Sequence, residues 1–214
     1  GAVTYYVDKN YAGGCGDTNP GTATQPWCTI GRSTTSLVPG DTVVVRPGVY
    51  NESITPVSGA TGAYVTYQGE PGAILDGTGS CATCRGFNIA SRMYVRVTGF
   101  EVRNFLNSTY DAINILGTSH HIELLNLRVH DSWNGIIMEA DTNKITIRDS
   151  EVYNVRYGVG FESTTHDITV ERVTSHHNQV LDSYGNGDGF SGDEGTYNIT
   201  IRDSSAYNNL DAGF

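Results

Sequence analysis

Acidic side chains return at one fixed place in a repeat that fills the second half of the chain. They stand five residues after the first residue of each predicted strand: Glu139, Glu162 and Asp193, with Leu116 at the equivalent place one repeat earlier. The strand-start positions form a second column: Asp111, Asn134, Tyr157, Asp188 and Ala212, with Asp211 adjoining. Stacked carboxylates repel one another unless water or a cation screens them, and Ca²⁺ prefers six to eight oxygen ligands.

A calcium site is therefore one interpretation of this cluster, and Glu162 and Asp193 are candidate ligands. Between His177 and Asp188 the chain also gains eight residues relative to the preceding repeats, and an insertion at one turn of a repeat commonly forms a binding loop. The alternative interpretation is a solvated acidic face on an acidic protein.

A second column alternates histidine and tyrosine along one outer strip of the repeat. It comprises Arg103, His130, Tyr153, His176 and Tyr207. Aromatic faces at the spacing of a repeat could stack on sugar rings, so Tyr153, His176 and Tyr207 are candidate substrate-binding residues. The alternative is a ladder of rings that pack on one another.

The elements that would position these columns follow from the repeat itself. The reference isoleucines Ile122, Ile145, Ile168 and Ile199 are spaced 23, 23 and 31 residues apart, and short alternating apolar runs surround them. A period in the twenties predicts a solenoid of stacked coils. The residues that follow the core positions Ile147, Val170 and Ile201 are Arg148, Glu171 and Arg202, and their charges alternate in sign. Stacking the coils in parallel would place opposite charges side by side, so the alternation favours parallel stacking.

The predicted fold is thus an all-β, right-handed parallel β-helix of roughly six or seven coils. Residues 1–40 do not repeat and are expected to form a first strand, a loop and a cap with a short helix within 27–38. Residues 41–214 are expected to form one continuous β-helix. We expect its C-terminal end to lack a cap, and an uncovered last coil would invite end-to-end self-association.

Composition narrows the class of protein. The formal net charge of −10 argues against nucleic acid as a partner, and no apolar stretch approaches the roughly 18 residues of a membrane helix.

Four cysteines, Cys15, Cys28, Cys81 and Cys84, predict two disulfides in a secreted protein, for example Cys15–Cys28 and Cys81–Cys84; zinc bound by four thiolates is the alternative. Sequons at Asn51, Asn107 and Asn198 are candidate glycosylation sites.

Two stretches resemble known families. The opening, YYVDKN followed by LVPGDTVVVRPGVYNE, resembles the N-terminal cap and first coils of the pectate-lyase-like β-helix superfamily. The segment NGDGFSGDEGTYNITIRDSSAYNNLDAGF resembles polysaccharide lyase family 9, the calcium-dependent pectate lyases. This resemblance implies that Asp188 and Asp211 ligate calcium; Ala212 replaces the family's next aspartate, and no lysine follows Lys144 to match the family's catalytic base.

Three functions are consistent with these observations. The first is a secreted β-helix that acts on or binds acidic polysaccharide, as a lyase would, with its catalytic base not found in this chain. The second is a structural or fibre-forming extracellular subunit. The third is a non-catalytic glycan-binding module that uses the Tyr/His strip.

Overall fold

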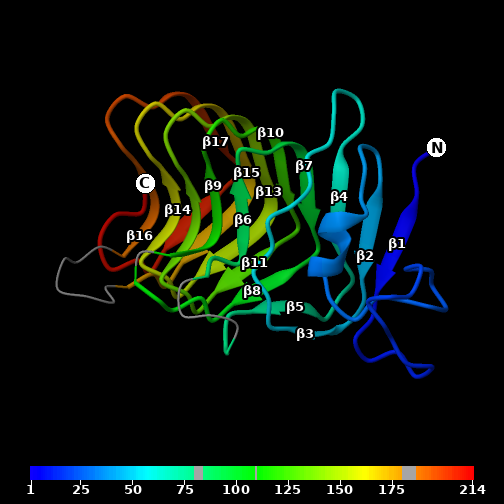
Figure 1. The fold of residues 1–214 in the computed structure, drawn as a ribbon. Coiled ribbons are helices and arrows are strands. Elements are labelled where there is room, and N and C mark those ends of the chain that lie inside the picture. Colours follow the sequence, from blue (N-terminus) through cyan, green and yellow to red (C-terminus); the bar gives the residue numbers. More distant parts are fainter. Residues whose placement is uncertain (80–83, 109, 180–186) are drawn as a thin grey trace.

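The computed structural model describes residues 1–79, 84–108, 110–179 and 187–214. It is an all-β solenoid whose coils lie in one row, with the N-terminal strand β1 at one end and the C-terminus at the other (Figure 1). Within the described residues, the only helix is the 3₁₀ helix η1 (Gly31–Thr35), in the segment where a short helix is expected. No helix of the described part is long and apolar enough to cross a membrane.

Two parallel sheets form the walls of the solenoid. The first has 13 strands: β1 (Thr4–Val7), β2 (Thr42–Val45), β3 (Gly48–Tyr50), β4 (Val65–Gly69), β5 (Ala73–Asp76), β7 (Met93–Thr98), β8 (Glu101–Arg103), β10 (His120–Leu125), β11 (Arg128–His130), β13 (Asn143–Tyr153), β15 (His166–His176), β17 (Tyr197–Arg202) and β18 (Ser205–Tyr207). The second has five: β6 (Phe87–Ala90), β9 (Asp111–Leu116), β12 (Asn134–Met138), β14 (Tyr157–Phe161) and β16 (Asp188–Gly192).

The strand register agrees with the sequence period. The reference isoleucines pair in one line, Ile122 with Ile145, Ile145 with Ile168 and Ile168 with Ile199. Their neighbours Leu124 and Ile147 are fully buried, as the inward columns predict. Because side chains alternate across a strand, this register fixes which residues face the core and which face outward.

Fewer coils are complete than the sequence suggests. Among the described residues the second sheet has five strands, so five coils contribute to both sheets rather than the expected six or seven. The first strands, β1, β2 and β4, add only to the first sheet, because the described residues between them and β6 form no strand of the second sheet. In the sequence the apolar runs of these three strands resemble full coils, but each run forms only part of a coil.

The corners of each coil use a left-handed backbone conformation. The polar column at one corner, Asn104, Asp131, Asn154, His177 and Asn208, has φ between 48° and 62° throughout. Asparagine and aspartate tolerate this conformation better than other non-glycine residues. The Asn104 and Asn208 side chains also donate to residues of neighbouring coils, to Asp76 at 3.0 Å and toward His177 at 3.3 Å, so this column has a structural role.

Alternating charges bridge neighbouring coils on the first sheet. The Arg172 Nε donates to Asp149 Oδ1 at 2.6 Å, and the Arg202 Nε donates to Glu171 Oε2 at 2.5 Å. This confirms the expected charge alternation. Each exposed pair contributes little stability, about 0–1 kcal/mol, so the ladder acts mainly on register.

A column of glycines lies at the start of the strands of the second sheet. An added Cβ at Gly135 would contact the Gly158 carbonyl oxygen, and one at Gly158 would lie 2.5 Å from the Gly189 oxygen. One at Gly189 would lie 2.7 Å from the Gly213 oxygen. The repeated glycine is therefore needed because the backbone of the next coil occupies the space of its side chain.

The N-terminal segment is joined to the solenoid by strand pairing. β1 pairs in parallel with β2, and Trp27 and Ile30 are buried against the first coils. Cys15 and Cys28 form a disulfide, as expected. Cys84 is also disulfide-bonded, and its expected partner, Cys81, lies outside the described residues. The division at residue 40 stays a prediction.

Candidate functional site

A groove of about 500 Å³ runs across the outer face of the second sheet, over β12, β14 and β16. The strand-start column forms one side and the acidic column forms the other, so the two columns singled out from the sequence lie in one site. Its acidic lining residues are Asp111, Glu139, Glu162, Asp188 and Asp193. The strand register accounts for this arrangement, because Asn134 pairs with Asp111 and Tyr157 pairs with Asp188.

The middle of the groove floor is a small apolar patch. It comes from the outward positions of the strands, where Ile137 and Gly160 are paired neighbours. An added Cβ at Gly160 would lie 2.8 Å from Ile137 Cδ1, so glycine leaves room for the isoleucine side chain to lie flat. A small apolar patch between polar walls is the kind of surface that a sugar ring fits.

Asp111 is the most buried carboxylate of the groove, at 4% exposure. Its two oxygens accept hydrogen bonds from the side-chain amides of Asn134, at 2.8 Å, and Asn114. Burial raises the pKa of Asp111 despite these hydrogen bonds. The Arg85 guanidinium lies 4.0 Å from Asp111 and 3.9 Å from Glu139, and so offsets part of the negative charge.

In the acidic column Arg85 reaches Glu139, whereas Glu162 and Asp193 form no ion pair with an arginine or lysine among the described residues. Partial burial, followed by the charges of Glu139, Asp193 and Asp111, raises the pKa of Glu162. This column therefore retains the unfavourable charge stacking that its sequence predicts. It contrasts with the first sheet, where acids and arginines alternate.

Arg156 places a positive charge in this otherwise acidic groove. Its guanidinium carbon lies 4.9 Å from the centre of the Trp133 ring and 4.6 Å from that of the Tyr157 ring. Stacking on two aromatic rings holds the guanidinium in a defined position. Arg156 and Asp188 both line the groove, and the backbone N–H of Asp188 donates to the Arg156 carbonyl at 3.1 Å.

The expected calcium ligands are only partly assembled. Asp188 is buried, and its Oδ1 accepts a hydrogen bond from the backbone N–H of Ala212 at 3.1 Å. Asp211 is exposed and does not line the groove, whereas Glu162 and Asp193 do. In the described part of the chain, no group of three or more Asp, Glu, His or Cys side chains could hold a metal ion. These residues alone do not fit a complete calcium site, so calcium stays a prediction.

The Tyr/His strip lies elsewhere, on the first sheet. Tyr153 stacks on His130 at 4.7 Å and on His176 at 5.1 Å, and His176 stacks on Tyr207 at 4.8 Å. The rings therefore pack face to face on one another, which is the alternative considered from the sequence, and His176 is buried. A role of Tyr153, His176 and Tyr207 in substrate binding stays a prediction.

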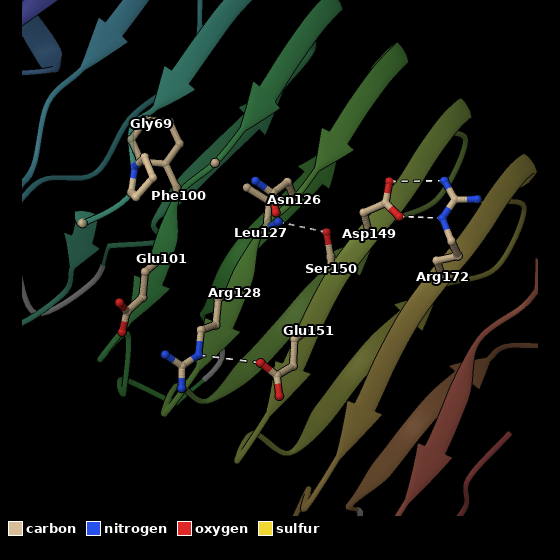
Figure 2. A pocket seen from close by; sticks show the side chains of 13 residues that line it. Gly69, Phe100, Glu101, Asn126, Leu127, Arg128, Asp149, Ser150, Glu151 and Arg172 are labelled. Carbon is tan, nitrogen blue, oxygen red and sulfur yellow. Dashed lines mark hydrogen bonds and ion pairs between the residues drawn. The ribbon is translucent and has the colours of Figure 1, made fainter.

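A second hollow, of about 460 Å³, lies on the first sheet (Figure 2). Its charged lining residues are paired with one another: Arg172 donates to Asp149, and Arg128 lies 3.6 Å from Glu151. The Ser150 hydroxyl accepts the backbone N–H of Leu127 at 3.1 Å. With these groups paired, this hollow is a weaker candidate than the groove.

The candidate glycosylation residues occupy three surface positions. Asn51 is exposed, and its amide donates to the Thr78 carbonyl at 2.9 Å. Asn198 is exposed and donates to Asp167 Oδ1 at 3.0 Å. Asn107 is exposed, and the threonine of its sequon lies outside the described residues. Glycosylation stays a prediction at all three.

Sequence reasoning missed two residues of the groove cluster, Arg85 and Asn114. Asn114 stands three residues after Asp111 on β9. Its position faces outward, yet its side chain is fully buried, which is unusual for a polar residue. Arg85 comes from a stretch before β6 that does not repeat, so no column of the alignment includes it.

The fold and the groove on its second sheet define the chain as a parallel β-helix protein. A family model described as "Pel9A-like, right handed beta helix region" matches residues 5–214. The chain therefore belongs to the Pel9A-like right-handed β-helix family, which confirms the suspected resemblance and the predicted fold. A search of curated proteins finds no match.

Solved structures show the same fold at low sequence identity. A pectate lyase, Pel9A, is 19% identical with a TM-score of 0.68, and the match covers 99% of this chain and 65% of that one. A rhamnogalacturonan lyase is 18% identical with a TM-score of 0.67, over 97% of this chain and 69% of that one. A GH136 lacto-N-biosidase from Eubacterium ramulus is 16% identical with a TM-score of 0.58, over 87% and 42%. The chain thus spans about two thirds of the lyases' length.

Proposed function

We propose that this chain binds an acidic polysaccharide in the groove of the second sheet, as the substrate-binding part of a lyase-type β-helix. The observation that carries the proposal is the groove itself, in which a small apolar patch at Ile137 and Gly160 lies between polar walls that include the stacked Arg156. The family match and the likeness to two polysaccharide lyases support the substrate class. The disulfide supports secretion.

Ionic conditions should govern this binding. The groove has five carboxylates among its lining residues, so a polyanion would be repelled unless Arg156 or a divalent cation offsets the charge. We propose Ca²⁺ as that cation, with carboxylates of the substrate completing a ligand set that the described residues leave incomplete.

Binding and β-elimination can be measured separately. Calorimetric titration with oligogalacturonate should show binding in Ca²⁺ that weakens in EDTA, and Asp188→Asn should reduce the calcium effect. Asp141→Asn, an exposed aspartate that does not line the groove, is the matched control. Absorbance of unsaturated uronate product reports cleavage. If neither binding nor product is found in either buffer, the proposal is wrong; binding without product supports the glycan-binding alternative.

A further inference from the structure

Gly160 on β14 lies in the floor of the groove and faces its interior. Its strand neighbours Val159 and Phe161 belong to the hydrophobic core, and because side chains alternate across a strand, position 160 faces the opposite, outer side. Gly160 pairs with Ile137 and Ser191 of the neighbouring coils, and all three line the groove. A side chain at position 160 would therefore project from the floor into the groove.

The backbone does not require glycine at this position. Gly160 is not among the described glycines with a left-handed φ, and its added Cβ would meet only side-chain atoms, Ile137 Cδ1 at 2.8 Å and Ser191 Oγ at 3.9 Å. Gly158, two residues earlier on the same strand, would instead place a Cβ 2.5 Å from the Gly189 carbonyl oxygen. The close approach of the coils thus explains Gly158 but does not explain Gly160.

Two explanations remain for this glycine, and they differ in what fills the space above it. The first is room for the Ile137 side chain, but the close contact is with its terminal methyl group, which can rotate away. The second is room for a ligand, because a glycine inside a strand often marks a close approach of a ligand or of another backbone. Apart from its chain neighbours, no backbone atom of the described residues lies within 4 Å of the added Cβ, which favours a ligand.

The side chains around Gly160 suit a sugar ring. Tyr157 lines the groove at the start of the same strand, and Glu162 lines it two residues after Gly160 on the opposite side. A ring above Gly160 would lie between these two side chains and against Ile137. The phenol and the carboxylate can both form hydrogen bonds with sugar hydroxyls, and Ile137 offers an apolar contact.

We infer that Gly160 is a specificity-determining residue, whose missing side chain leaves the space in which one sugar ring of the bound polysaccharide lies. This inference rests on the proposed function and states where along the groove the polymer is seated. It implies that a larger residue at position 160 keeps the β-helix but excludes the polysaccharide.

The test fills this space one step at a time. Calorimetric titration with oligogalacturonate in Ca²⁺ compares the parent chain with Gly160→Ala and Gly160→Val. One extra methyl group in a fitted pocket changes affinity by about tenfold or more, so Gly160→Ala should bind about tenfold more weakly and Gly160→Val more weakly still. Thermal unfolding followed by circular dichroism checks that the variants fold. Gly160→Ala tests the inference even where the larger valine prevents folding.

A double variant separates the two explanations. Ile137→Val removes the Cδ1 atom that the new Cβ would meet. If glycine only makes room for Ile137, adding Gly160→Ala to Ile137→Val should not change the affinity. If glycine makes room for the sugar, the double variant should bind about tenfold more weakly than Ile137→Val alone.

Gly13→Ala is the matched control outside the groove. Gly13 is exposed, and its added Cβ would also lie 2.8 Å from a side-chain atom, Tyr11 Cε1, so this variant should leave the affinity unchanged. A parent chain that binds while Gly160→Ala binds equally well would overturn the inference and leave the proposed function standing. The same conclusion follows if the double variant binds as tightly as Ile137→Val. A parent chain that binds in neither Ca²⁺ nor EDTA would overturn both.

Discussion

Glu162 stands on the rim of the groove between two other carboxylates, Glu139 and Asp193. Its raised pKa means that the folded chain holds a proton more tightly than the unfolded chain does. The corresponding stability is fully present below the unfolded pKa and is lost as the pH rises through the folded pKa. Ionised Glu162 is therefore a source of instability at neutral pH.

Replacing Glu162 should show how much its ionised side chain destabilises the folded chain. We expect Glu162→Gln to melt at a higher temperature than the parent at about pH 7, and at the same temperature near pH 3.5, where the parent glutamate is also protonated. Thermal unfolding followed by circular dichroism over this range measures the difference. Glu194→Gln, an exposed neighbour, should show no such dependence; a gain that is equal at both pH values would contradict the explanation.

At the scale of the element, the glycine column controls how closely coils stack. Gly158→Ala should destabilise the chain by roughly 1–3 kcal/mol, because the new Cβ would lie 2.5 Å from a backbone oxygen that cannot move alone. Denaturant unfolding gives the difference in free energy of unfolding.

The same strand offers a control. Gly160→Ala on β14 would place a Cβ 2.8 Å from Ile137 Cδ1, the end of a side chain that can rotate away. Its cost should be clearly smaller than that of Gly158→Ala. Equal losses for the two variants would contradict the close approach of coils as the explanation of the column, because restricting the unfolded chain by a Gly→Ala change does not itself destabilise.

The charge ladder is a second property of the strands. Arg172→Glu would place a third carboxylate beside Asp149 and Glu171, so we expect a loss of about 1 kcal/mol or more. Asp149→Arg in the same chain should recover part of that loss. About 1 M salt should shrink the difference between parent and variant, since exposed charges are then largely screened; a loss that salt does not change would point to packing instead.

The sequence predicts elements better than it predicts the site. The alignment of Ile122, Ile145 and Ile168 sets the register, because a half-buried strand cannot slip without exposing its core face. The groove depends on side-chain contacts between coils, which the repeat period does not predict. Asn114 bridges two carboxylates from different coils, Asp111 and Glu139, and Arg85 reaches them from outside the repeat.

At the scale of the whole molecule, each coil contacts mainly the coils before and after it. Stability in such a stack is close to a sum over coils and their interfaces, and the ends open first. The Cys15–Cys28 disulfide lies in the segment attached to the first coil through β1. Its effect should therefore be local.

This locality can be tested by removing the disulfide. The double variant Cys15→Ser, Cys28→Ser should lose about 3 kcal/mol from the stability of the N-terminal segment, as expected for a loop of about this length. Hydrogen exchange should accelerate in residues 1–40 and β2 but not in β13 and β15. A uniform acceleration over all strands would show that the stack unfolds as a single unit.

The alternating charges of Arg148, Glu171 and Arg202 also limit how a gene that encodes such a stack of coils can lengthen by duplication. Tandem duplication of a single coil would place two acidic or two basic copies side by side, whereas duplication of a neighbouring pair would keep opposite charges in contact. The smallest insertion that leaves this ladder intact is thus two coils. Lineages that lengthened by this route should differ from one another by even numbers of repeats along the charged stretch.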